Sequence, residues 1–290
     1  MSGNSNLKTR TISALVGAVI MITAILVGRE LLLGLMLAAG IIAYYELTRA
    51  LGVHEADKKL NCLELIGIAS SVVWYLFIEF YHEKIFTMLG LGFLLILIYM
   101  LLIMAMYVFT FPRFESGQVM SAIVALIYGP IEMSFIYLIW SLNQGIYMVW
   151  LVFVCSWICD IGAYLIGIKF GKHHFVPQLS PKKTVEGCLG GIAFSLIIGG
   201  LYAYFVVAPN ISSASTMKVI MIIEIIALLG SMFSMVGDLA ASAIKRNRNI
   251  KDYGKIMPGH GGIMDRFDSL FFVAPIIYIL LITAMQWGIL

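Results

Sequence analysis

The sequence predicts an all-α integral membrane protein, a polytopic helical bundle of about nine transmembrane helices. Of its 290 residues, 61% are hydrophobic and only 12% are charged, whereas roughly a quarter of the residues in soluble domains are charged. Its apolar runs reach about 20 residues, the length needed to cross a hydrocarbon core of about 30 Å. These runs are too long and continuous for the strands of a membrane barrel, so we expect helices.

The predicted spans follow one another along the whole chain. They are 11–28, 31–50, 63–81, 86–111, 118–141, 146–168, 189–208, 218–244 and 269–288. The first run follows Lys8 and Arg10, as a signal sequence would. However, it is long, has no small-residue cleavage site and leads directly into the second span, so we interpret it as an uncleaved helix.

The basic residues predict the orientation. If the N-terminus is cytoplasmic, 16 of the 19 Lys and Arg residues fall in inside segments, and only Arg29, Lys84 and Lys218 lie outside. Cytoplasmic segments of membrane proteins are enriched in Lys and Arg. We therefore expect a cytoplasmic N-terminus and an external C-terminus.

Polar residues are distributed unevenly. Five of the six aspartates lie at or after residue 160, and no linker separates two domains. We therefore expect one integral-membrane unit, with 1–145 as a transmembrane scaffold and 146–290 as the catalytic half. Glu46, Glu79 and Glu132 lie in or near spans, where ionisable groups are costly. Glu46 and Glu79 fall close to span ends, so we expect them to snorkel toward the headgroups.

The cysteines are interpreted as packing residues. Cys155 and Cys159 lie one helical turn apart, but neither Cys62 nor Cys188 completes a second pair, and no histidine stands at ligand spacing. A structural metal site would require such additional ligands.

Two basic loops, 171–187 and 245–262, combine Lys, Arg, Ser, Thr, His and Gly on the predicted cytoplasmic side. Lysine and arginine bind phosphate oxygens through charge-assisted hydrogen bonds, and glycine allows close backbone approach. These loops therefore favour a polyanionic substrate. The alternative is that they only determine topology or contact anionic lipid.

Acidic residues beside these loops indicate a cation. Counted along their helices, Asp160, Asp238 and Asp265 are expected to converge near the inner headgroup layer. Carboxylates facing bound phosphates would repel them unless a metal ion lay between, and Mg²⁺ favours carboxylates, water and substrate phosphates. Helix capping is the alternative for Asp265, and pairing with a neighbouring basic residue is the alternative for Asp238.

Three stretches together resemble the integral-membrane phosphatidate cytidylyltransferases, also called CDP-diacylglycerol synthases. They are "SAIKRNRNIKDYGKIMPGHGGIMDRFD" (242–268), "SPKKTVEG" (180–187) and "DIGAYLIGIKFGK" (160–172). Every polar position of the family's signature is present. Met257 departs from it, since the family usually has a branched aliphatic residue there, and this changes packing alone.

The resemblance implies a reaction of CTP with phosphatidate that yields CDP-diacylglycerol and pyrophosphate and requires Mg²⁺, with a second cation left open. The catalytic residues implied are Asp238, Asp265, Lys245, Arg246, Lys251, His260 and Arg266, with Asp238 and Asp265 as metal ligands. The substrate-binding residues implied are Ser180, Lys182, Lys183, Thr184, Asp160, Ser242, Gly261, Gly262 and Asp268. His260 is expected to donate a hydrogen bond to a phosphate.

Two other functions remain open: a CTP-dependent polyprenol or lipid kinase, and an ion-coupled transporter. The partners expected are CTP, phosphatidate and membrane lipids, with no nucleic acid. The expected location is a bacterial inner membrane, with the active site on the cytoplasmic side. Small residues in the seventh span permit close helix contact and so allow a homodimer; they are Gly190, Gly191, Gly199 and Gly200.

Overall fold

The chain folds into long helices and one short β-hairpin. The structure, a computed structural model, describes residues 2–54, 59–211, 215–257, 259 and 261–290. In this part of the chain, eight helices are long and apolar enough to cross a membrane: Arg29–Leu51, Cys62–Tyr81, Thr87–Phe109, Ser116–Ser141, Gly145–Phe170, Val185–Asn210, Thr216–Asn247 and Met264–Gln286. The prediction of an all-α polytopic membrane protein is confirmed.

The first predicted span differs from the others. Residues 11–28 lie in helix α1 (Ser2–Val27), but its apolar part, Thr11–Val27, is shorter than the eight spanning helices. The sides on which the two termini lie depend on whether this helix crosses the bilayer, and they stay a prediction.

Contacts divide the chain into two compact units. One contains Met1–Ser141 and Ile244–Phe267, and the other contains Leu142–Ala243 and Asp268–Leu290. The predicted division into a scaffold, 1–145, and a catalytic half, 146–290, stays a prediction. The sequence did not predict that Ile244–Phe267, most of the family signature, belongs to the same unit as the scaffold helices. Helices α12 (Thr216–Asn247) and α13 (Met264–Gln286) each contribute residues to both units.

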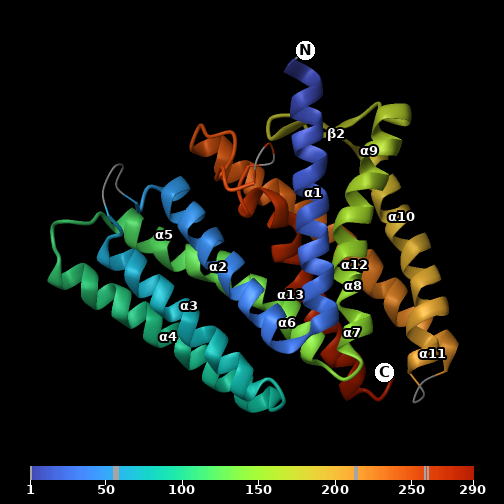
Figure 1. The fold of residues 1–290 in the computed structure, drawn as a ribbon, viewed down its shortest axis with the longest axis horizontal. Helices are drawn as coiled ribbons and strands as arrows, with labels where there is room; N and C mark the ends of the chain where they lie inside the picture. Colours follow the sequence, from blue (N-terminus) through green and yellow to red (C-terminus); the bar gives the residue numbers. More distant parts are fainter. Residues whose placement is uncertain (1, 55–58, 212–214, 258, 260) are drawn as a thin grey trace. The chain divides into compact units, whose positions relative to one another are not determined.

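The first unit contains six further elements after α1 (Figure 1), namely α2 (Arg29–Leu51), α3 (Cys62–Tyr81), α4 (Ile85–Phe109), α5 (Ser116–Leu126), the π-helical turn η1 (Ile127–Ile131) and α6 (Glu132–Ser141). Pro130 lies within η1. Proline has no backbone N–H to donate, and the π turn accommodates this missing hydrogen bond. Gly40 of α2 lies against this turn, since a Cβ there would be 3.0 Å from the Pro130 Cα atom. The glycine therefore lets the two helices pack closely.

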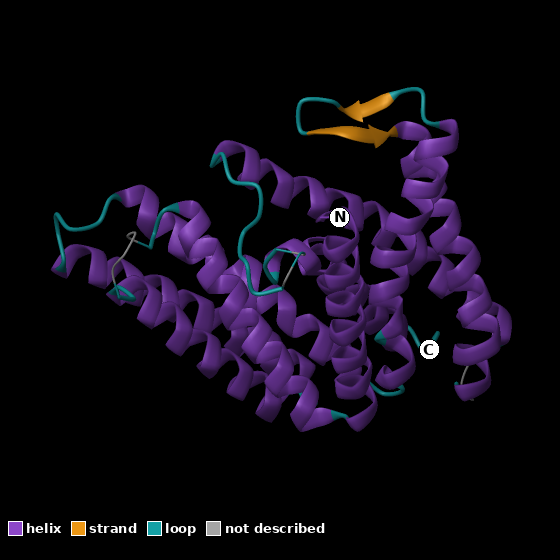
Figure 2. Ribbon diagram, turned by 45° about the horizontal axis from the view of Figure 1, so that its top comes forward, coloured by secondary structure: helices purple, strands orange, loops and turns teal. Residues whose placement is uncertain are grey.

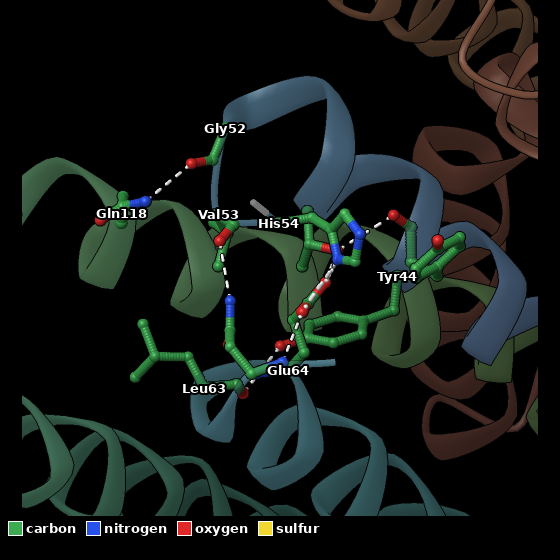
Figure 3. A network of polar contacts seen from close by, with 10 residues as sticks. Tyr44, Gly52, Val53, His54, Leu63, Glu64 and Gln118 are labelled. Atoms are coloured by element: carbon green, nitrogen blue, oxygen red, sulfur yellow. Dashed lines mark hydrogen bonds and ion pairs between the residues drawn. The ribbon is translucent and has the colours of Figure 1, made fainter. Parts of the chain in front are cut away.

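A buried polar network connects α2 to α3 (Figure 3). The Glu64 carboxylate accepts hydrogen bonds from the Asn61 backbone N–H at 2.9 Å and the Thr48 hydroxyl at 3.2 Å. It also lies 2.9 Å from His54 Nδ1. Asn61 in turn accepts from the Glu64 backbone N–H at 3.0 Å, which completes a capping box. Glu64 therefore has a structural role at the start of α3.

The second unit consists of helical spans and the hairpin (Figure 2). Its elements are α7 (Gly145–Met148), α8 (Trp150–Phe153), η2 (Val154–Ile158), α9 (Cys159–Phe170), β1 (His174–Val176), β2 (Ser180–Thr184), α10 (Val185–Tyr202), η3 (Ala203–Val207), α11 (Ala208–Asn210) and the larger parts of α12 and α13. Strands β1 and β2 pair antiparallel. The predicted loop 171–187 is therefore mostly a hairpin between α9 and α10.

Small residues pack the helices of this second unit. Gly190 and Gly191 of α10 lie directly against side chains of α9, and Gly199 contacts Ala227 of α12. These glycines serve packing within one chain, so they no longer support the predicted homodimer. The cysteines have the same purpose, because the buried Cys155 and Cys159 thiols donate to backbone carbonyls of α12. Cys155 and Cys159 thus pack within the unit, and for Cys62 and Cys188 the same interpretation stays a prediction.

Candidate active site

Asp265, in the first turn of α13, is the centre of a buried polar cluster in the first unit. Its side chain accepts a hydrogen bond from the Lys245 ammonium at 3.0 Å. The other carboxylate oxygen accepts backbone N–H groups of Tyr253 at 2.8 Å and Gly262 at 3.0 Å. The residue is only 7% exposed. The signature loop between α12 and α13 is thus bound at both of its ends by one carboxylate.

The local sequence explains how the chain reaches this geometry. Helix α12 ends at Asn247, and Asn249 adopts a positive φ of 52°, a conformation that asparagine tolerates at helix ends. Near the other end of the loop, Gly261 has a φ of 87° and pairs with Met257. A Cβ atom at Gly261 would lie 2.7 Å from an Asp265 carboxylate oxygen. Glycine is therefore required for both backbone conformation and space.

Glu46 of α2 is a second carboxylate at the start of α13. It accepts hydrogen bonds from the backbone N–H groups of Ile263 at 3.1 Å and Met264 at 2.8 Å. It is 3% exposed, so the expectation that it snorkels to the headgroups is wrong. The first N–H groups of a helix have no partner inside the helix, and Glu46 supplies that partner across the interior of the unit.

The second predicted span-end acid is also paired. Glu79 accepts a hydrogen bond from the Tyr137 hydroxyl and forms an ion pair with Arg29 at 2.6 Å. Its side chain is 22% exposed. Its charge is therefore balanced by a partner within the protein rather than by headgroups alone.

Asp238 of α12 is the acidic residue of a polar cluster in the second unit. Its carboxylate forms an ion pair with Lys183 of β2 at 2.5 Å. Asp160 of α9 interacts electrostatically with both residues. The sequence did not pair this hairpin lysine with either acid, and the predicted convergence of Asp160, Asp238 and Asp265 stays a prediction.

Two local features position this second cluster. The Thr184 hydroxyl accepts the Gly187 backbone N–H at 3.2 Å and caps α10, so the residue that follows Lys183 is anchored. Gly237, directly before Asp238, lies against α13, because a Cβ there would be 2.7 Å from the Asp268 carbonyl oxygen. The backbone beside Asp238 is therefore closely packed.

Most of the other predicted residues that the structure describes occupy more open positions. Exposed side chains belong to Arg246, Lys251, Arg266 and Lys182, and half-buried ones to Ser180, Ser242 and Asp268. Thr184 and Gly262 each already use a polar atom inside the protein, the Thr184 oxygen for α10 and the Gly262 N–H for Asp265. His260 lies outside the described residues. The roles assigned to all these residues stay predictions.

The donor set is compatible with Mg²⁺. Among the described residues, no three His, Cys, Asp or Glu side chains gather into a metal site. Mg²⁺, however, is usually bound through one or two carboxylates together with substrate phosphates and water. A carboxylate offers about four lone-pair positions, and the Asp265 side chain uses three of them in the contacts above. The Asp265 side chain therefore keeps a lone-pair position with which it could contact a metal, and the assignment of Asp238 and Asp265 as metal ligands stays a prediction.

Glu46 and the Tyr253 backbone N–H are the contributors that the sequence analysis missed. An acidic residue inside an apolar span was the available signal for Glu46, but its sequence position near the span end made snorkelling the simpler explanation. Its partners Ile263 and Met264 lie more than 200 residues away in the sequence. No local pattern indicates such a contact.

Comparison with known proteins agrees with the predicted family. A family model described as "Cytidylyltransferase family" matches residues 8–284. A protein of Bacillus subtilis named phosphatidate cytidylyltransferase is 33% identical over 280 residues, which cover 95% of this chain and 98% of the relative. Relatives of the same name from Staphylococcus saprophyticus and Staphylococcus aureus are 32% and 30% identical, and each match covers 95% of this chain and 99% of the relative. The chain belongs to the cytidylyltransferase family.

Proposed function

We propose that this chain is a CTP:phosphatidate cytidylyltransferase, which makes CDP-diacylglycerol and pyrophosphate for phospholipid synthesis. The observation that carries the proposal is the full-length similarity to relatives named phosphatidate cytidylyltransferase. The Lys245–Asp265 pair, which lies within 242–268, and the Lys183–Asp238 pair, whose lysine lies within 180–187, support it. The kinase and transporter alternatives have no comparable support.

In the proposed reaction, a phosphate oxygen of phosphatidate attacks the α-phosphorus of CTP. A new phosphorus–oxygen bond forms, the bond from the α-phosphorus to the bridging oxygen breaks, and pyrophosphate leaves with that electron pair. The attacking phosphate monoester is already anionic, so the protein mainly has to neutralise charge and align the reactants.

The lysine–aspartate pairs are suited to that task. In the structure, Lys245 and Lys183 are held by Asp265 and Asp238. A bound phosphate would give each ammonium a second anionic partner, while Arg246, Lys251 and Arg266 are exposed and able to contact further phosphate oxygens. Mg²⁺ would be held by Asp238 and Asp265, and when bound it would neutralise charge on the nucleotide phosphates.

The membrane setting determines how substrates arrive. The protein is an integral membrane protein with bacterial relatives, and we propose that its site faces the cytoplasm, where CTP is available. We further propose that phosphatidate enters sideways from the inner leaflet. A soluble phosphate monoester without acyl chains should then react far more slowly than phosphatidate; equal turnover of the two would contradict lateral entry.

The reaction can be tested with the purified protein in detergent, supplied with CTP, phosphatidate and Mg²⁺. We expect pyrophosphate release that requires phosphatidate, together with formation of a CDP-lipid. Asp238→Asn and Asp265→Asn should abolish both products. Formation of CDP without pyrophosphate would instead indicate a kinase, and no nucleotide turnover in a folded preparation would point to transport.

A further inference from the structure

We infer that Glu46 is a positioning residue, which holds the start of α13 and the end of the signature loop so that the Asp265 carboxylate is correctly placed. This inference rests on the proposed role of Asp265 in the reaction. Glu46 lies on α2, outside every stretch that resembles the family's motifs. Its carboxylate nevertheless contacts the backbone immediately before Asp265.

Glu46 is hydrogen-bonded to the start of α13 through both oxygens of its carboxylate. Each Glu46 oxygen accepts a different backbone N–H, from Ile263 at 3.1 Å and from Met264 at 2.8 Å. Both are donors at the N-terminus of α13, where negative charge is favoured by the helix dipole. Since Asp265 is the next residue, the two bonds restrict the backbone from which its side chain projects.

The loop between α12 and α13 packs closely around the Glu46 carboxylate. Gly254, near the middle of the loop, and Gly262, near its end, both lie so close to the Glu46 carboxylate that a Cβ atom on either would overlap it. Gly262 also donates its N–H to Asp265 at 3.0 Å. The loop is thus held between two carboxylates, and any change at Glu46 is transmitted to the Asp265 hydrogen bonds through Gly262.

The burial of the Glu46 carboxylate is explained by its contacts with the signature loop. Burial of a carboxylate is costly unless it is paired and hydrogen-bonded, and Glu46 is 3% exposed within a helix of membrane-spanning length. Glu64 provides a comparison in the same unit, since it is equally buried and also accepts a backbone N–H. Its hydrogen bonds, however, connect α2 with α3 (Figure 3). The contacts of Glu46 are directed at the signature loop.

The experiment compares Glu46→Gln with the matched control Glu64→Gln. Both replace a buried carboxylate by an amide of the same size. For Glu46→Gln we expect kcat, or the apparent affinity for Mg²⁺, to fall about 10- to 100-fold, as for residues that orient a metal ligand. Glu64→Gln should lower thermal stability while leaving the Mg²⁺ dependence unchanged.

A second readout does not depend on activity. Hydrogen–deuterium exchange in the absence of substrate should become faster at the Ile263 and Met264 amides in Glu46→Gln and stay unchanged there in Glu64→Gln. Glu46→Asp, which keeps both oxygens and the charge, should restore part of the protection and activity. Gly262→Ala places a Cβ atom against the Glu46 carboxylate and should displace it. We expect the same faster exchange and lower activity in this variant, which supplies the test if Glu46→Gln does not fold.

The outcomes separate the two proposals. If Asp265→Asn is folded and fully active, the proposed role of Asp265 fails and the inference fails with it. If Asp265→Asn is inactive while Glu46→Gln and Gly262→Ala keep normal kcat, Mg²⁺ dependence and exchange, the inference alone is overturned. The inference alone is also overturned if Glu46→Gln and Glu64→Gln change kcat, Mg²⁺ dependence and exchange to the same extent.

Discussion

Replacing Asp265 separates its structural role from its chemical role. In Asp265→Asn, the remaining carbonyl oxygen can still accept the N–H groups of Tyr253 and Gly262, and the new amide replaces the oxygen that faces Lys245. The lost contact is therefore one charge-assisted hydrogen bond. Such bonds contribute about 1.5 to 3 kcal/mol, and the Lys245 side chain, 18% exposed, can recover part of this by hydration. We expect destabilisation of about 1 to 2 kcal/mol.

Asp265→Ala should behave differently, because besides the Lys245 contact it removes the acceptor for two backbone N–H groups. Removing one member of a largely buried pair typically costs about 3 to 5 kcal/mol. Both variants should lose pyrophosphate release by roughly 100-fold or more, since changes even to groups that support a metal ligand cost 10- to 100-fold. Asp265→Asn should thus be folded and inactive, and Asp265→Ala unstable and inactive.

The assay combines CTP- and phosphatidate-dependent pyrophosphate release with thermal inactivation in the same detergent. Glu83→Gln, at an exposed acidic residue between α3 and α4, controls for the loss of one negative charge and should match the wild type in both measurements. The reasoning is refuted if folded Asp265→Asn keeps more than about a tenth of wild-type kcat. It is also refuted if Asn and Ala at this position are equally destabilising.

Three further predictions follow from the two clusters. Lys183→Gln removes the partner of Asp238. It should raise the KM for CTP, measured by pyrophosphate release, by about tenfold or more, because a charge-assisted contact contributes at least about 1.5 kcal/mol. An unchanged KM would exclude Lys183 from nucleotide binding. Gly261→Ala should destabilise the protein by about 1 to 3 kcal/mol and also reduce activity, since the new Cβ atom would approach Asp265. The control Gly288→Ala, at a φ of 64° with open space around it, should reduce stability alone. Chelation of Mg²⁺ should abolish turnover and readdition should restore it, and full activity in excess chelator would contradict the metal assignment.

The fold class and the family follow from the sequence alone. Span length and apolar composition identify membrane helices because the bilayer requires them locally, without reference to partners elsewhere in the chain. The family signature is equally local, since its polar residues stand at fixed separations within 242–268. The apolar part of the first helix, Thr11–Val27, is shorter than the eight spanning helices, so its crossing of the bilayer stays a prediction.

The partners of each site residue were decided by tertiary structure. The sequence singled out Asp238 and Asp265 beside the basic loops, but it did not identify Lys183 as the partner of Asp238 or Glu46 as the cap of α13. Glu46 and Glu79 had the same sequence context near span ends, yet Glu46 is buried against a helix N-terminus, whereas Glu79 pairs with Arg29. Local patterns report whether a segment is helical and apolar. Which donor meets a carboxylate depends on contacts between segments that the sequence separates widely, and only the packed helices bring these together.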